Sequence, residues 1–154
     1  MRAGVLLFYL TGGMVFLQLV VGGTVVFGFV MTYVHIITGF VTLGFASVAT
    51  AAAVASKPSY QPVKVHGALI LSLVGIQGLL GFVVLNTGSP ALTLIHFTNA
   101  LLIYGAAISG IFFARRWAAM PLTEKQGPVA LAIIVAVVIV VVLVFIGRTF
   151  FYPG

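Results

Sequence analysis

The stretch that decides the fold is Ile76–Gly110, IQGLLGFVVLNTGSPALTLIHFTNALLIYGAAISG. It places one histidine, His96, inside an apolar segment long enough to cross a membrane. The turn-forming residues Asn86–Pro90 divide the stretch into two parts, each with the composition of a membrane helix. The stretch therefore predicts a helical hairpin whose second helix carries an imidazole.

A weaker copy of this pattern lies upstream. The motif Gln77-x-x-x-Gly81 is repeated as Gln18-x-x-x-Gly22, and His96 has its counterpart in His35. Small residues follow each histidine at the same two offsets; these are Gly39 and Gly44 after the first, and Ala100 and Gly105 after the second. A repeat of helix, outer turn and histidine-bearing helix predicts a pair of hairpins, each delivering one imidazole.

Composition restricts the class of protein. With 5% charged residues and a mean hydropathy of +1.32, the 154 residues indicate an integral membrane protein. Because there is no cysteine, disulfides, thiolate metal sites, iron–sulfur clusters and covalent haem attachment are excluded. The net charge of +6 comes from residues in short loops with no basic stripe, so we expect no nucleic-acid partner.

The apolar runs predict an all-α integral membrane protein: a four-helix transmembrane bundle made of two repeated helical hairpins, plus a fifth, peripheral transmembrane helix. The segment after Arg2 is too long and lacks a clear cleavage site for a signal peptide, so we interpret it as a retained first span. The predicted spans are residues 3–23, 33–55, 65–85, 92–114 and 129–146. The predicted domains are a haem-binding bundle at 1–114 with hairpins at 3–55 and 65–114, a cytoplasmic loop at 115–127, and the fifth helix with an outer tail at 128–154.

Basic residues predict the orientation. With a cytoplasmic N-terminus, six basic residues lie inside and only Arg148 lies outside, as the positive-inside rule requires. We therefore expect a multi-pass protein of the cell (plasma) membrane, with its C-terminus outside and both His35 and His96 near the outer surface. The fifth span is apolar on every side, which is typical of a helix that packs on lipid or on a partner subunit.

The paired histidines predict a cofactor. Zinc or non-haem iron needs three or four protein ligands, and Glu124, the single acidic residue, falls in an inner loop. Haem iron needs only two axial ligands, so His35 and His96 are the predicted metal ligands of a haem, with haem b as the expected form. Three more residues are predicted to bind the cofactor. Gly39 and Gly81 are expected to leave room for a flat ligand, and the Arg148 cation is expected to meet the haem propionates.

Other polar residues predict less. His66 lies near the inner end of the third span and is expected to be an interfacial histidine. Gln18 and Gln77 are expected to bond across the bundle rather than to line the cofactor pocket. No serine–histidine–acid set, phosphate loop or intramembrane carboxylate is present, so the catalytic residues are unknown and any chemistry would belong to the haem.

These residues resemble the haem A synthase family, whose members are built as two fused four-helix halves with a histidine near the outer end of each second and fourth helix. The resemblance covers about residues 10–110, one half of a full-length member. It rests on Leu17–Gly23 (LQLVVGG), His35 with Gly39, Ile76–Val84 (IQGLLGFVV), Asn86–Pro90 (NTGSP) and Leu94–Leu102 (LIHFTNALL). It implies axial ligation by the two histidines, self-association to replace the missing half, and oxidation of haem O to haem A for terminal oxidases.

Two positions differ from the half of the family that binds the substrate. Thr32 stands where that half has a glutamate, and Ile36 stands where it has an arginine. The outer cysteine pair of many members is also absent. By the resemblance, the chain is closer to the half that holds haem b as an electron carrier.

Three hypotheses remain open from the sequence. The first is a haem A synthase-type oxidoreductase with haem O and haem A as substrate and product. The second is a non-catalytic b-type cytochrome subunit. The third is a cofactor-free structural subunit in which the histidines only bond helices together. The expected partners are the lipid bilayer and either further copies of the chain or a respiratory or oxidase-assembly complex.

Overall fold

The computed structural model describes residues 3–55 and 59–120. These residues form four α-helices and no strand. The helices are α1 (Ala3–Val26), α2 (Thr32–Ala55), α3 (Gln61–Thr87) and α4 (Pro90–Ala119). The all-helical prediction is confirmed for this part of the chain. The predicted fifth helix, Arg148 and Glu124 lie outside the described residues.

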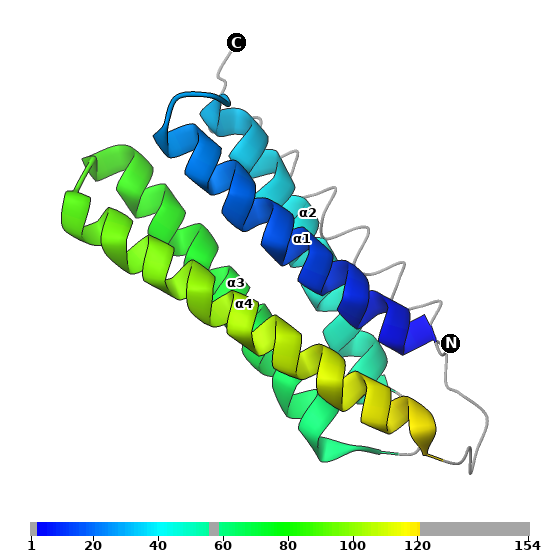
Figure 1. Ribbon diagram of the computed structural model, residues 1–154. Coiled ribbons are helices and arrows are strands. Elements are labelled where there is room, and N and C mark those ends of the chain that lie inside the picture. The colour runs from blue at the N-terminus through cyan, green and yellow to red at the C-terminus, as the bar shows by residue number, and fades with distance from the viewer. Residues whose placement is uncertain (1–2, 56–58, 121–154) are drawn as a thin grey trace.

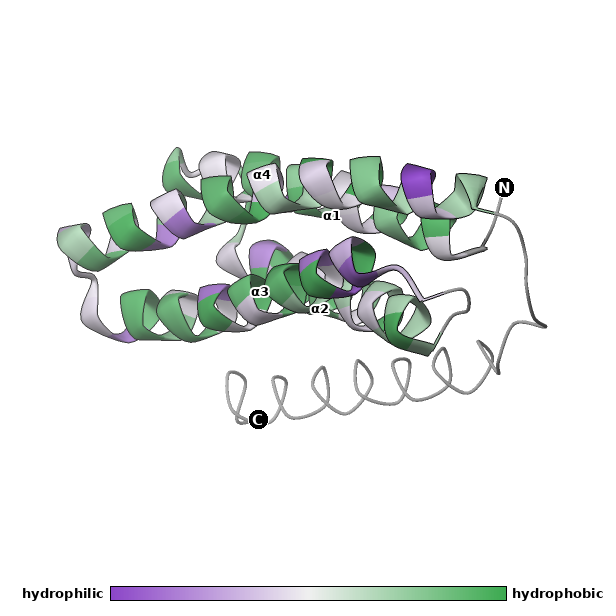
Figure 2. Cartoon of the chain, turned by 90° about the horizontal axis from the view of Figure 1, so that it is seen from below, coloured by the Kyte–Doolittle hydropathy of each residue, from purple (hydrophilic) through white to green (hydrophobic). Residues whose placement is uncertain are grey.

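Each helix is long and apolar enough to cross a membrane, which fits a multi-pass membrane protein. Their lengths are 24, 24, 27 and 30 residues. The chain coloured by hydropathy is apolar over most of its length, with few hydrophilic positions (Figure 2). Large apolar side chains such as Phe16, Leu79 and Phe112 are exposed on the outside of the bundle, as expected of helices surrounded by lipid.

Most helices extend beyond the predicted spans. The fourth helix continues through Arg115 and Arg116, which the sequence assigned to a loop, and the third begins four residues before the predicted start at Val65. The predicted spans followed apolar runs, whereas a helix can continue into the polar interface, where basic side chains reach water. The turn between α3 and α4 is set by two capping residues. Gly88, with a φ of 60°, ends α3, and the Ser89 hydroxyl accepts a hydrogen bond from the Leu92 N–H at the start of α4.

The four helices form an antiparallel bundle in which each helix packs against two others (Figure 1). α1 contacts α2 and α4, and α3 contacts the same two helices. α2 and α4 therefore lie diagonally across the bundle and run in the same direction. The α1–α2 turn and the α3–α4 turn lie at one end of the molecule (Figure 1).

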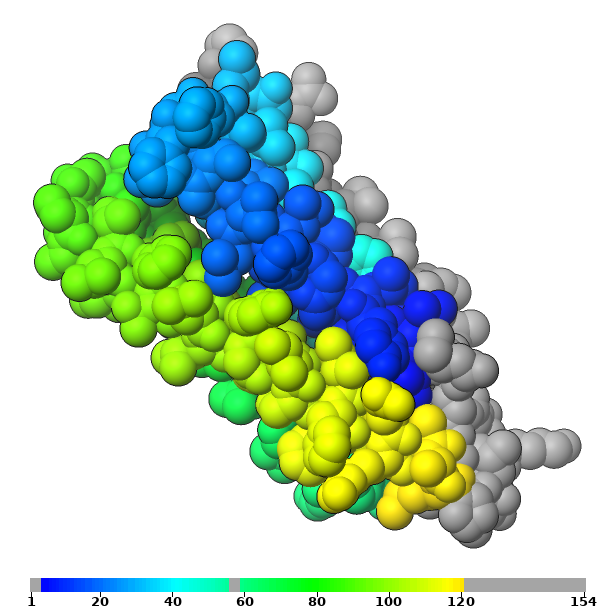
Figure 3. All heavy atoms as spheres, in the orientation of Figure 1, coloured from blue at the N-terminus to red at the C-terminus, as the bar shows by residue number. Residues whose placement is uncertain are grey.

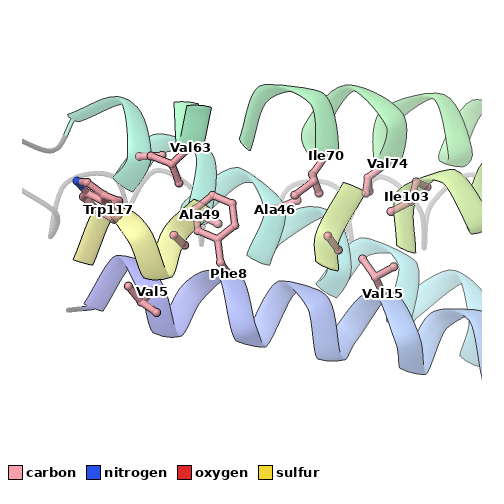
Figure 4. Close-up of a cluster of buried hydrophobic side chains, with 13 residues drawn as sticks. Val5, Phe8, Val15, Ala46, Ala49, Val63, Ile70, Val74, Ile103 and Trp117 are labelled. Atoms are coloured by element: carbon pink, nitrogen blue, oxygen red, sulfur yellow. The ribbon is translucent and has the colours of Figure 1, made fainter. Parts of the chain in front are cut away.

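The hydrophobic core fills only the other end, which we call the packed end. It comprises the buried residues within 5–15, 46–53, 63–74 and 103–117. Trp117, Phe8 and Val63 are among the most completely buried side chains there (Figure 4). Small residues let the helices approach closely; a Cβ on Gly67 would lie 3.1 Å from the Cα of Thr50 in α2.

The end with the two turns is different, and we call it the open end. It comprises residues 16–41 and 75–98, none of which is buried. The space-filling view shows the surface hollowed between α1 and the α3–α4 pair at this end (Figure 3). The bundle is thus closed at one end by apolar packing and lacks an apolar core at the other.

Candidate haem site at the open end

His35 of α2 and His96 of α4 face each other at the open end. Their ring centroids are 6.2 Å apart, and the ring planes are inclined by 74°. The two residues come from the diagonal helices, so the space between the rings lies on the axis of the bundle. The structure therefore brings together the two histidines that the sequence paired.

A glycine on the preceding helix makes room for each imidazole. A Cβ on Gly22 would lie 2.9 Å from the Cε1 of His35, and a Cβ on Gly81 would lie 3.1 Å from the Cε1 of His96. Both distances are shorter than a normal contact between carbon atoms, which is about 3.5–4.0 Å. Each glycine is thus required by the position of the facing ring.

The side chain of Gln18, in α1, holds His35 at two points. Its amide nitrogen lies 3.0 Å from Nδ1 of the ring and donates a hydrogen bond of 2.8 Å to the backbone carbonyl of His35. The Oε1 atom of Gln18 accepts a hydrogen bond from the hydroxyl of Thr38. The amide therefore links the ring, the backbone and the next helical turn of α2.

The side chain of Gln77, in α3, contacts His96. Its amide nitrogen lies 3.1 Å from Nε2 of the ring. Its Oε1 accepts a 2.8 Å hydrogen bond from the Nδ2 of Asn99, which also donates to the carbonyl of Leu73. The other ring nitrogen of His96, Nδ1, is the one buried side-chain polar atom without a hydrogen-bond partner in the described part of the chain.

Neutral imidazole is the commonest metal ligand among side chains, so two facing imidazoles are a candidate pair of metal ligands. Two imidazoles bound to opposite sides of one metal, each with a bond of about 2.0 Å, have ring centroids roughly 6 Å apart. Each ring can rotate about its bond to the metal, so the observed inclination is compatible with this arrangement.

The described residues contain no cluster of three or more histidine, cysteine, aspartate or glutamate side chains that would hold a metal ion by themselves. The donor set at this site consists of two imidazoles and neutral amide and hydroxyl groups. It fits a metal that brings its remaining ligands with it, as iron does in a porphyrin.

The structure places the other predicted residues as follows. Gly39 lies beside the amide of Gln18, where a Cβ would be 3.1 Å from Nε2, and not beside an imidazole. Gly75 and Gly78, on the same helix as Gly81, have no atom within 4 Å of an added Cβ. Among the remaining cofactor residues, Arg148 lies outside the described residues.

His66 lies at the packed end. Its Nδ1 is 2.9 Å from the carbonyl of Pro62, and its ring packs against Phe113 with centroids 4.4 Å apart. It thus lies at the opposite end of the bundle from the paired histidines, as the sequence predicted.

The sequence interpretation missed the contacts of the two glutamines with the histidines. It also missed Thr38 and Asn99, which each lie three residues after a histidine and bind the carbonyl oxygen of a glutamine. The signal was present as a repeated His-x-x-polar pattern, because residues three apart share a helix face.

Comparisons of the chain with protein-family models, with curated proteins and with solved structures found no match.

Proposed function

We propose that the chain is a membrane-embedded haem protein in which His35 and His96 are the two axial ligands. The observation that carries this proposal is the pair of facing imidazoles, 6.2 Å between centroids, at the end of the bundle that has no apolar core. A histidine within a membrane span is costly without a partner, and two that converge on one point are best explained by a shared ligand.

Haem is the metal group that these residues fit best. The porphyrin supplies four iron ligands, so two protein ligands complete the coordination. Gly22 and Gly81 keep the volume beside each ring free. When bound, the haem would supply one-electron chemistry, while the chain's residues would hold it and exclude water.

Within this proposal, haem A synthase type is the first candidate activity. Its supports are the resemblance of residues 10–110 and the equivalence of the two helix pairs. In each pair a glutamine and a glycine four residues later contact the histidine of the next helix. This equivalence favours the interpretation of the bundle as two repeated hairpins. The enzyme would oxidise a methyl group of haem O, with further copies of the chain supplying a second haem site.

The second candidate is a b-type cytochrome subunit that passes electrons within a respiratory complex. The specific observation in its favour is the chemistry around the histidines. The side chains that contact the two imidazoles are neutral amides, and the position of the family's glutamate is Thr32, so no acid or base of the described chain adjoins the rings. With both axial positions taken, such a haem exchanges electrons without binding a substrate at iron.

The topology belongs to the same proposal. We place the N-terminus in the cytoplasm, the open end near the outer surface of the plasma membrane, and a fifth helix with an outer tail at residues 128–154. The basic residues of the chain support this orientation. An oligomer, or a larger respiratory or oxidase-assembly complex, would cover the apolar fifth helix.

The test is a dithionite-reduced minus oxidised absorption spectrum of the detergent-purified protein, followed by extraction and chromatography of its haem. Haem b alone supports the electron carrier, and haem O or haem A supports the synthase. Co-expression with a source of haem O that gives no formyl haem would exclude the synthase. A colourless protein that keeps its helices and does not take up added haem would refute both and leave the histidines as links between helices.

A further inference from the structure

We propose that Gln77 caps the imidazole of His96 in the haem-free protein, and that it competes with iron for the same lone pair. This inference rests on the haem site proposed above. It assigns to Gln77 a role opposite to that of the residues that usually support a metal-binding histidine.

The orientation of the Gln77 amide follows from its neighbours. The Nδ2 of Asn99 must donate to the carbonyl of Leu73, because a carbonyl can only accept. The same Nδ2 donates to Gln77 at 2.8 Å, so the atom of Gln77 facing Asn99 is its oxygen. The amide nitrogen of Gln77 consequently faces Nε2 of His96 at 3.1 Å, and a primary amide nitrogen can only donate.

The consequence for His96 is a defined tautomer. A neutral imidazole has one nitrogen with a lone pair and one that carries hydrogen. Because Nε2 accepts from Gln77, its lone pair is occupied and the hydrogen is on Nδ1. This Nδ1 is the buried atom that has no partner. The ring therefore has no free lone pair for iron until Gln77 withdraws.

Gln18 contacts His35 in a different way. One hydrogen of its amide is directed to the backbone carbonyl of His35, which fixes the nitrogen end toward His35. The same nitrogen lies 3.0 Å from Nδ1 and 3.4 Å from Nε2 of the ring. A donor aligned with the lone pair of one ring nitrogen lies far from the other nitrogen, because the two lone pairs point away from each other. The amide of Gln18 therefore lies over the ring of His35 and does not occupy a lone pair that iron would use.

In most metal sites the second nitrogen of a ligating histidine donates to a carboxylate, a carbonyl or water, which strengthens the ligand. Here the partner of His96 is a donor, and its acceptor oxygen is turned away toward Asn99. The hydrogen bond must break before the ring can bind a metal. Removing the glutamine should therefore strengthen haem binding, whereas removing an ordinary supporting residue weakens it.

The experiment is a haem titration of purified haem-free protein in detergent, comparing wild type with Gln77→Leu and Gln18→Leu. Leucine is close to glutamine in size and has no hydrogen-bonding group. Gln77→Leu should bind haem roughly three- to tenfold more tightly than wild type, the equivalent of one hydrogen bond that no longer has to be broken. Gln18→Leu should not bind haem more tightly, because Gln18 occupies neither lone pair of His35. The thermal midpoint of the haem-free protein should fall at the same time.

Gln61→Leu is the matched control, because Gln61 is on the same helix as Gln77, is exposed and lies at the packed end. Its haem affinity should equal that of wild type. Unchanged or weaker haem binding in Gln77→Leu would overturn the competition. That result differs from a wild-type protein that binds no haem, which would refute the haem site itself.

A second measurement needs no variant at the site. Nitrogen NMR of histidine-labelled haem-free protein, with the His66 signal assigned by His66→Ala, reports which nitrogen of each ring carries hydrogen. His96 should carry it on Nδ1, with Nε2 as a hydrogen-bonded acceptor. A hydrogen on Nε2 of His96 would overturn the capping arrangement even if both leucine variants failed to fold.

Discussion

Replacing Gly22 by alanine tests the geometry of the proposed haem site most directly. The added Cβ would lie 2.9 Å from Cε1 of His35, while two carbon atoms in contact are normally about 3.5–4.0 Å apart. The ring would have to move by roughly 0.6 Å. Metal–ligand distances tolerate deviations of only about 0.2 Å, so this displacement is larger than a coordinated imidazole can absorb.

The strain should appear mainly in the haem-bound state. In the haem-free protein the half-buried ring of His35 can swing toward the open end, but a ring bound to iron has to stay in place. Overpacking of this kind costs about 1–3 kcal/mol. A central value of about 2 kcal/mol corresponds to a roughly thirtyfold rise in the Kd for haem.

The assay is the haem titration of Gly22→Ala beside Gly23→Ala. The neighbouring Gly23 has no atom within 4 Å of an added Cβ, so its variant has the same composition and no clash. Gly81→Ala, with 3.1 Å to Cε1 of His96, should have an effect in the same direction but smaller, and Gly78→Ala is its matched control. If Gly22→Ala binds haem as tightly as Gly23→Ala with an identical spectrum, the ring is not held where the site requires it.

Three further predictions concern the ligands, the packed end and the cofactor. His35→Ala and His96→Ala should each abolish the low-spin bis-histidine spectrum, while His66→Ala should keep it; a spectrum that survives both ligand variants contradicts the assignment. Gly4→Ala would place a Cβ 2.5 Å from Cζ3 of Trp117 and should lower the thermal midpoint by destabilising the packed end, with the haem spectrum unchanged. Loss of the spectrum at an unchanged midpoint would contradict this separation of the two ends. Removing haem should increase hydrogen exchange mainly in residues 16–41 and 75–98, and a uniform increase along all four helices would argue against a site confined to the open end.

Apolar run length was enough to predict the four described helices. A segment such as the one after Gln61 is apolar for the thickness of a membrane and has to satisfy its backbone groups internally, which only a helix does here. The helix ends were predicted less well, because the apolar run ends at the membrane interface while the backbone hydrogen bonding of the helix continues beyond it. Arg115 and Arg116 are therefore helical although they end the apolar run.

The pairing of His35 and His96 was predictable, because equal offsets in two similar segments put both at the same depth. Their contacts with the glutamines were not. Such contacts depend on how each helix is rotated, and a helix that is apolar on nearly every side gives no pattern from which to deduce that rotation. Gly75 and Gly81 show the effect of this rotation: six residues at 100° each leave them about 120° apart, and only Gly81 faces an imidazole.

The difference between the two ends of the bundle follows from what occupies its axis. At the packed end Ala46, Ala49 and Ala53 keep α2 close to its neighbours, and Trp117 and Phe8 fill what remains. At the open end each helix pair is still joined, through a glutamine and a histidine, but no apolar side chain between the pairs is buried. The helices are therefore packed together at one end only. At the other end, the polar residues that line the space between the helix pairs set its width. A flat group bound by both imidazoles would connect the two pairs at that end, where it would take the place of the missing apolar core.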